Sequence, residues 1–258
     1  MNQPGPLLCP CGSGLRAVRC CQMPPVGALS PPESTRHLVP LVERAVQAHR
    51  HGATDTAERL CLEVLELAPD RPGALMVLYQ IRNAQGRQAA AEALIRRIVG
   101  FDPNNFWATN ELTLLLLGKG NLAEAEIHAR NAVRIAPTNP QSHNLMGMVL
   151  TEGQRPQVAE YHYRRVLELS QGRDPIVLAN LAWCLKNQGR MAEARELYEE
   201  SVAGAPEVRQ TLLGFARLEE ADRNFEASGR ILDRMDTLWP DDVIDLAEAL
   251  LRLRRVPC

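Results

Sequence analysis

The chain has 258 residues, of which 45% are hydrophobic and only 4% aromatic, and its formal net charge is −2. These values are sufficient for a folded core built mainly from aliphatic side chains, and they argue against a globally cationic nucleic-acid binder. No apolar run approaches the roughly 18 residues of a membrane-spanning helix. The first residues carry neither a basic start nor the long apolar stretch of a secretory signal, so we expect a cytoplasmic protein with reduced thiols and no membrane contact.

The N-terminal segment, 1–24, is expected to form a small metal-binding module. It holds four of the seven cysteines: Cys9, Cys11, Cys20 and Cys21. One residue separates the first two thiols, and two adjacent thiols begin nine residues later, so all four sulfurs can converge on one ion. Zinc favours tetrahedral thiolate sites. Gly12 and Gly14 allow the tight turn that such a site needs. A segment this short cannot fold by apolar burial alone, so the metal would supply its stability.

This arrangement resembles the SEC-C metal-binding motif, best known from the tail of the preprotein-translocase motor ATPase. The motif reads Cys-x-Cys-Gly-Ser-Gly, five further residues, and then Cys followed by His or Cys; residues 9–14 and 20–21 match it. The resemblance implies Zn²⁺ as the cofactor. Arg16 and Arg19 lie in the same loop and are expected to offset the net −2 charge of a four-thiolate zinc site. Residues 15–19 lack the lysine-rich, aromatic character of the family's partner-binding versions, which argues against its association with secretion chaperones or ribosomes.

Other interpretations of the cysteines remain open at this point. Disulfides or free thiols would leave the Gly-Ser-Gly spacing unexplained. Iron–sulfur ligation is a further alternative, although adjacent cysteines are unusual for it. If zinc is bound, its role is structural rather than catalytic, because four protein thiolates leave no open position for water or substrate.

A proline-rich, semi-rigid linker, 25–37, leads into a stretch that repeats every 34 residues. Three kinds of residue mark the period. Alanines recur at Ala57, Ala91, Ala125 and Ala159, prolines at Pro69, Pro103 and Pro137, and glycines at Gly52, Gly86 and Gly120. After one inserted residue near 170–174 the pattern resumes with Gly189, Ala194 and Pro206. A fixed period of this length is typical of stacked-repeat folds.

One unit, 72–105, shows the physics of the repeat. Apolar residues recur at helical spacing before and after Gly86, which lets the chain reverse at little steric cost. Pro103 ends the second helix because proline has no N–H to donate. An alanine early in the second helix fits a close helix crossing. Each unit is therefore predicted to be a helix–turn–helix hairpin that neighbours must cover.

The pattern resembles the tetratricopeptide repeat (TPR). The resemblance implies an all-α fold: a right-handed TPR α-solenoid of about six repeats over 38–242. The units are 38–71, 72–105, 106–139, 140–174, 175–208 and 209–242, and 243–258 is expected to be a capping helix. The departures include Arg44 where a Leu is usual, and Asp222-Arg223 where the sixth unit should have its turn glycine. Cys61 and Cys184 fall on apolar helical positions and are expected in the core.

In the resembled family the first helices line a concave groove that binds peptides or partner helices. By register, the groove residues here are Met76, Gln80, Trp107, Asn110, Gln141, Asn144, Met148, Trp183, Lys186 and Arg217. Asn and Gln can pair with the backbone of an extended peptide, and Trp and Met offer apolar pockets. The full Lys and Asn set of the family's carboxylate clamp is missing, so no C-terminal-carboxylate peptide is predicted.

No catalytic constellation stands out, so we expect a protein-interaction scaffold that is not an enzyme and that binds a protein or peptide in the groove, with the zinc module as a second contact site. The alternative is the N-terminal part of a larger enzyme, because the register around 213–221 weakly resembles repeat arrays that precede sulfotransferase domains. A third hypothesis is contact with nucleic acid or the ribosome through Arg16, Arg19 and Arg36. Pairing of two copies through an exposed end stays open.

Overall fold

The computed structural model describes residues 8–22, 34–170 and 172–240, and these are all helical apart from loops and one short bridge. The chain divides into two compact units, Met1–Ile135 and Ala136–Cys258, each of which is described by itself below. The predicted capping helix, 243–258, and most of the predicted linker lie outside the described residues. Among those residues, no helix is both long enough and apolar enough to cross a bilayer.

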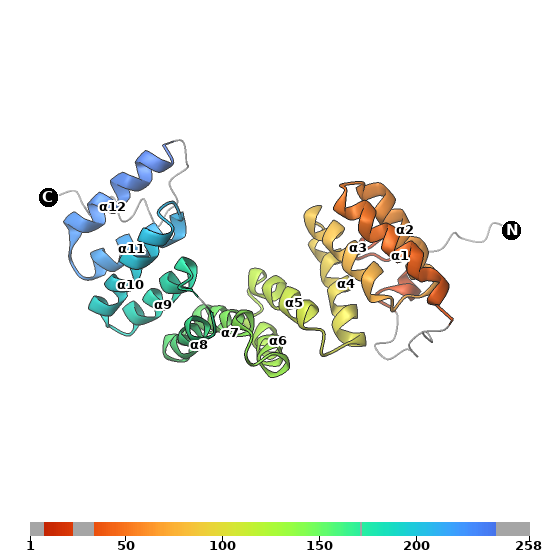
Figure 1. Ribbon diagram of the computed structural model, residues 1–258, viewed down its shortest axis with the longest axis horizontal. Coiled ribbons are helices and arrows are strands. Elements are labelled where there is room, and N and C mark those ends of the chain that lie inside the picture. The colour runs from red at the N-terminus through yellow and green to blue at the C-terminus, as the bar shows by residue number, and fades with distance from the viewer. Residues whose placement is uncertain (1–7, 23–33, 171, 241–258) are drawn as a thin grey trace. The chain divides into compact units, whose positions relative to one another are not determined.

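The N-terminal unit contains three antiparallel helix pairs, drawn in red to green in Figure 1. Two 3₁₀ turns, η1 (Ala17–Arg19) and η2 (Arg36–Leu38), precede them. The helices are α1 (Val39–Arg50), α2 (Thr54–Leu67), α3 (Pro72–Ala84), α4 (Gln88–Phe101), α5 (Phe106–Gly118) and α6 (Leu122–Ile135).

The C-terminal unit contains three more pairs, drawn in green to blue (Figure 1). Its helices are α7 (Pro140–Glu152), α8 (Pro156–Leu169), α9 (Pro175–Asn187), α10 (Met191–Gly204), α11 (Arg209–Ala221) and α12 (Phe225–Leu238). The described residues thus form twelve helices in six hairpins, and the prediction of about six helix–turn–helix repeats is confirmed.

The periodic alanines lie at fully buried positions in the second helices of their hairpins. Ala57, Ala91, Ala125, Ala159 and Ala194 all have no exposed surface. A larger side chain at these points would push the helices apart, as the sequence suggested. The expected core cysteines Cys61 and Cys184 are also fully buried.

The turns inside the hairpins need a residue with positive φ. Gly52, Gly86, Gly120 and Gly189 supply it, with φ between 69° and 80°. Two repeats lack a glycine there and force Gln154 (φ 56°) and Arg223 (φ 60°) into the left-handed region. The second of these is the place where the sequence already departed from the repeat pattern. The hairpin geometry therefore overrides the local backbone preference, at a cost of roughly 1–2 kcal/mol per residue.

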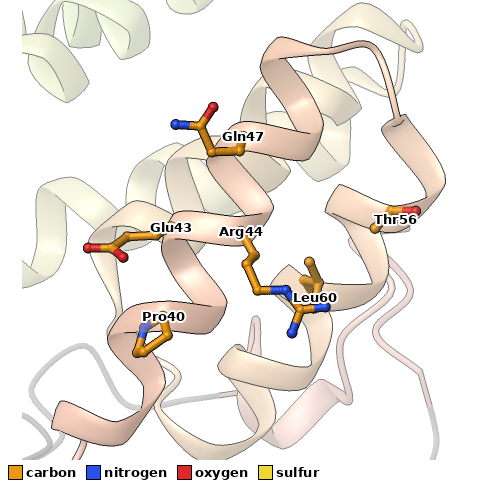
Figure 2. Close-up of a pocket in the computed structure, with 6 residues that line it drawn as sticks. All are labelled: Pro40, Glu43, Arg44, Gln47, Thr56 and Leu60. Atoms are coloured by element: carbon orange, nitrogen blue, oxygen red, sulfur yellow. The ribbon is translucent and has the colours of Figure 1, made fainter.

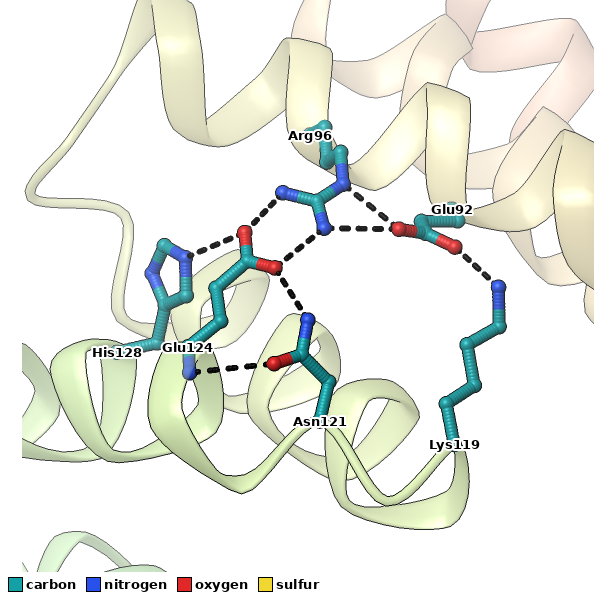
Figure 3. A network of polar contacts seen from close by, with 6 residues as sticks. All are labelled: Glu92, Arg96, Lys119, Asn121, Glu124 and His128. Atoms are coloured by element: carbon teal, nitrogen blue, oxygen red, sulfur yellow. Dashed lines mark hydrogen bonds and ion pairs between the residues drawn. The ribbon is translucent and has the colours of Figure 1, made fainter.

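A polar network joins the second and third hairpins of the N-terminal unit (Figure 3). The guanidinium of Arg96 on α4 bridges Glu92 on its own helix, at 2.8 Å, and Glu124 on α6. Lys119 pairs with Glu92, and Asn121 donates to Glu124 at 2.8 Å. The hydrogen bond from Arg96 lowers the pKa of Glu124 against the opposing effect of burial. These contacts fix the stacking of one hairpin on the next.

Candidate metal centre and groove

Residues 8–22, here called the cysteine loop, form a compact double turn. The ends of the first turn meet at an antiparallel bridge between Leu8 and Arg16, and the Cys9 N–H donates to the Leu15 carbonyl at 2.7 Å. Gly12 and Gly14 have φ of 83° and 88°, which only glycine adopts at little cost. The 3₁₀ turn η1 then carries the chain back to the second pair of cysteines.

The four sulfur atoms converge. The Sγ atoms of Cys9, Cys11, Cys20 and Cys21 all lie within 4.8 Å of one another, and none of the four forms a disulfide. Cys11 and Cys20 Sγ are 3.5 Å apart, and Cys20 and Cys21 Sγ are 4.0 Å apart. A tetrahedral zinc with Zn–S bonds of 2.3 Å requires neighbouring sulfurs about 3.8 Å apart. The donor set and its spacing therefore fit a four-thiolate metal ion.

The electrostatics of the loop also favour a cation. Burial raises the pKa of Cys9, but hydrogen bonds from the amides of Cys11 and Cys21 outweigh it and bring the pKa to about 6. Burial and the Cys11 charge raise the pKa of Cys20 to about 11, although the Ser13 hydroxyl lies 3.2 Å from its sulfur. The pKa of Cys21 is raised further still, and the largest cause is burial. The first thiolate formed thus opposes the others, and a bound metal would overcome that repulsion and release their protons.

The cysteine loop is docked on the first two hairpins by a buried arginine. Arg82 on α3 is only 1% exposed, and its Nε and Nη2 donate to the Ser13 carbonyl at 3.2 and 3.0 Å. The same guanidinium forms a bidentate pair with Glu58 on α2 at 2.7 and 2.8 Å. A Cβ at Gly14 would lie 2.9 Å from Arg82 Nη2, so the close approach requires glycine. The loop therefore packs as part of the N-terminal unit.

The two arginines expected to offset the thiolate charge have different surroundings. Arg16 pairs with Glu66 on α2 instead of being held for the thiolates, and Arg19 is half-exposed at the end of η1. Arg97 on α4 donates to the Pro69 carbonyl, and its pKa is lowered by burial although the nearby cysteines raise it.

The predicted groove residues lie on the first helices of their hairpins. In the N-terminal unit Gln80 is exposed, Met76 and Trp107 are half-buried, and Asn110 is buried. Trp107 packs edge-on against Tyr79 at a centroid distance of 5.5 Å, so part of its ring is already in contact. In the C-terminal unit Gln141 is exposed, and the remaining predicted residues are half-buried: Asn144, Met148, Trp183, Lys186 and Arg217.

A pocket of about 550 Å³ opens among the first helices of the C-terminal unit. Trp183 and Asn180 on α9 line it together with Arg217 on α11, and Thr151 and Ile176 contribute further surface. Burial and the neighbouring Arg217 charge lower the pKa of Lys186 on α9. The pocket combines an aromatic face with a positive charge and side-chain amide groups.

Comparison with known proteins agrees with this geometry. Residues 144–209 match a family model described as a tetratricopeptide repeat. The chain resembles the structure of PilF from Pseudomonas aeruginosa, with a TM-score of 0.67 at 18% identity over 86% of this chain and 98% of that one. The fold is that of the tetratricopeptide repeats.

Two further structures share this TPR fold. A tetratricopeptide repeat protein from Parabacteroides merdae gives a TM-score of 0.71 at 15% identity, over 85% of this chain and 86% of that one. YrrB, described as a TPR protein with an unusual peptide-binding site, gives a TM-score of 0.57 at 18% identity, over 75% of this chain and 96% of that one. A search of curated proteins gives no match. The predicted all-α TPR fold class is confirmed.

The first TPR hairpin has a second pocket, of about 690 Å³, between α1 and α2. Figure 2 shows Arg44 extending from α1 toward Leu60 on α2, with Glu43 and Gln47 beside it. Arg44 occupies a position where TPR units usually have leucine, and its side chain is exposed. A charge is tolerated at this position because the side chain is exposed.

Proposed function

We propose that the chain is a protein-interaction scaffold that binds an extended segment of a partner in the groove of its C-terminal unit. The observation that carries this proposal is the pocket lined by Trp183, Asn180 and Arg217. Partly exposed aromatic and arginine side chains in a recess are the residue types that dominate binding energy at interfaces. The peptide-binding site reported for YrrB, a TPR protein of similar fold, supports a peptide-like ligand.

The cysteine loop is proposed to be a structural zinc site of the SEC-C type. Four convergent thiols, two of them buried, support a closed tetrahedral ion without an open coordination position. Cys9, Cys11, Cys20 and Cys21 would hold the metal, which would contribute folding energy to the loop. The loop would then serve as an N-terminal cap on the first two hairpins.

The groove is tested by comparing capture of partners by the purified full chain and by Trp183→Ala. A captured protein is then titrated against both forms. We expect the variant to bind at least tenfold more weakly, because aromatic anchors commonly contribute about 2 kcal/mol. Tyr161→Ala is the matched control: this ring is 63% exposed on α8, outside the pocket. Equal affinity of Trp183→Ala and the wild type would refute the groove.

The metal is tested by elemental analysis of the protein as purified. One zinc per chain is expected for the wild type, and loss of the metal for Cys20→Ser. A wild-type chain that neither contains zinc nor takes it up from solution would refute this part of the proposal. Because the two experiments use different residues and readouts, the groove and the metal site can fail separately.

A further inference from the structure

A tyrosine hydroxyl at the pocket of the C-terminal unit has no hydrogen-bonding partner among the described residues. Tyr198 on α10 lines this pocket and is only 2% exposed. Its hydroxyl forms no hydrogen bond with any residue that the structure describes. A Cβ added to Gly214 would lie 2.7 Å from Tyr198 Oη, and Gly214 also lines the pocket, so the hydroxyl lies at the pocket wall. Buried polar groups are almost always hydrogen-bonded, and this one is placed to bind a ligand.

The preceding hairpin shows that the repeat can supply a partner for a tyrosine at this position. Tyr163 on α8 is the equivalent residue, 35 positions before Tyr198, and its hydroxyl lies 3.2 Å from the hydroxyl of Thr151. The residue 35 positions after Thr151 is Lys186. The fifth hairpin therefore has a cation where the fourth has a neutral hydroxyl, and Tyr198 loses its partner within the repeat.

The charges near this hydroxyl favour an anionic ligand. Arg217 lies one helical turn beyond Gly214 on α11 and lines the same pocket. Its guanidinium forms neither an ion pair nor a hydrogen bond within the described part of the chain. The pKa of Lys186 is lowered, first by burial and then by Arg217, and Glu220 opposes this with a smaller effect. Glu152 is the one carboxylate among the described lining residues, and it belongs to α7. A bound anion would relieve the repulsion between the two cations.

We propose that this pocket selects its partner segment by an aspartate or glutamate side chain, whose carboxylate accepts hydrogen bonds from the Tyr198 hydroxyl and the Arg217 guanidinium. This inference rests on the proposed function and adds the chemistry of the ligand. A carboxylate can accept from both donors, and hydrogen bonds between charged groups are the strong ones. Trp183 and Ile176 line the same pocket and would contact an apolar side chain beside the acidic one. A phosphoryl group carries about two charges and suits a cluster of arginines better than a pocket lined by one arginine and one carboxylate.

The test is a library of short random peptides with blocked ends, so that no terminal charge contributes, passed over the immobilised full chain. We expect the retained peptides to be enriched in Asp and Glu, and Arg217→Gln to abolish this enrichment. A retained peptide is then compared with a copy that carries the amide in place of the acid, and the wild type should bind the copy about tenfold more weakly. Tyr198→Phe should weaken binding of the acidic peptide by about tenfold as well. The matched controls are Tyr163→Phe, whose hydroxyl already has a partner, and Arg230→Gln on α12, and both should keep wild-type affinity.

Equal binding of the acidic peptide and its amide copy by the wild type would overturn the inference, and so would an acidic enrichment that Arg217→Gln and Tyr198→Phe leave unchanged. A second library that contains phosphoserine separates the two kinds of anion, and a preference for phosphoserine over Asp and Glu would also overturn it. In these cases the groove still binds peptides, so the proposed function survives. If the wild type retains no peptide, or Trp183→Ala binds the same peptides equally well, the proposed function fails and the inference fails with it. Should a variant fail to fold, the comparison of the two peptides on the wild type decides alone.

Discussion

Replacing Arg82 with methionine should destabilise the protein much more when zinc is bound than when it is absent. With the cysteine loop folded, the buried guanidinium satisfies both the Ser13 carbonyl and the Glu58 carboxylate. Methionine keeps much of the side-chain volume but donates nothing. The variant therefore leaves a buried carbonyl and a partly buried carboxylate without their shared partner.

The size of the effect follows from burial. Removing one partner of a buried ion pair costs about 3–5 kcal/mol, and the lower end applies here because the Glu58 side chain is 26% exposed. Without metal the loop should unfold, so the wild type also loses the Ser13 contacts and Arg82 becomes accessible to solvent. The remaining pair with Glu58 is then worth about 1 kcal/mol, as for surface ion pairs. The metal-dependent difference should be about 2 kcal/mol.

Urea unfolding followed by circular dichroism measures this difference, with saturating zinc in one series and excess chelator in the other. Arg195→Met serves as the control: Arg195 pairs with Glu219 and Asp222 in the C-terminal unit, so its cost should not depend on metal. Equal losses for Arg82→Met in the two series would show that the loop and α3 are not coupled, and would refute the reasoning.

Three further predictions concern the repeats. Gly86→Ala should lower the free energy of unfolding by about 1 kcal/mol, because φ at this position is +69°. Gly100→Ala should raise it by about 0.5–1 kcal/mol, because Gly100 lies inside α4 and no atom is near the added methyl group. Thermal unfolding of both variants tests the two signs. Burial and the neighbouring imidazole lower the pKa of His162 from 6.5 to about 4. The unfolded chain therefore binds a proton in that window that the folded chain does not, so stability should fall as the pH drops from 6.5 toward 4, and it should fall less in His162→Asn. Arg96→Gln should lower the free energy of unfolding by about 1 kcal/mol, because it removes the ion pairs with Glu92 and Glu124. The loss should be smaller in 1 M salt, which screens these charges, and the midpoints of urea unfolding measure both values.

The hairpins could be predicted from the sequence because their determinants are local. A left-handed turn selects glycine at Gly86 and Gly120, a close crossing selects alanine at Ala91 and Ala125, and Pro103 ends a helix, all within one period. The cysteine cluster was also predictable, since ligand spacing within 13 residues restricts how the sulfurs can meet. In each case the physical rule acts over a short stretch of chain.

The docking of the cysteine loop could not be predicted, because it depends on contacts between distant residues. Arg82 is 69 residues from Ser13, and in the sequence it follows the apolar run of α3 without any mark of its own. A charged residue on the buried side of a helix was the available signal, since an arginine is rarely 1% exposed unless it is paired. The ion pair between Arg16 and Glu66 on α2 was likewise not predicted, because the two residues are 50 positions apart.

The contact between His143 and His162 could not be predicted from the sequence either, because it joins side chains on two different helices. Repetition explains why His128 and His162 share a register, but not why the His162 Nδ1 lies 3.0 Å from His143 Nδ1 on the preceding helix. The second nitrogen of His143 lies 3.0 Å from the Pro137 carbonyl, which requires a proton on that nitrogen. His143 is then the acceptor and His162 the donor when both rings are neutral. Two charged rings at this distance would repel, and this repulsion adds to burial in keeping His162 neutral.

The repeat architecture itself explains how neighbouring hairpins are joined. In three places a residue donates to the carbonyl of the proline 28 positions before it, and that residue is Arg97, Asn131 or Arg234. Because an amide and a guanidinium both serve, the contact needs a donor of sufficient reach and not a particular charge. A stabilising contact can therefore recur along the array while the residue that makes it changes.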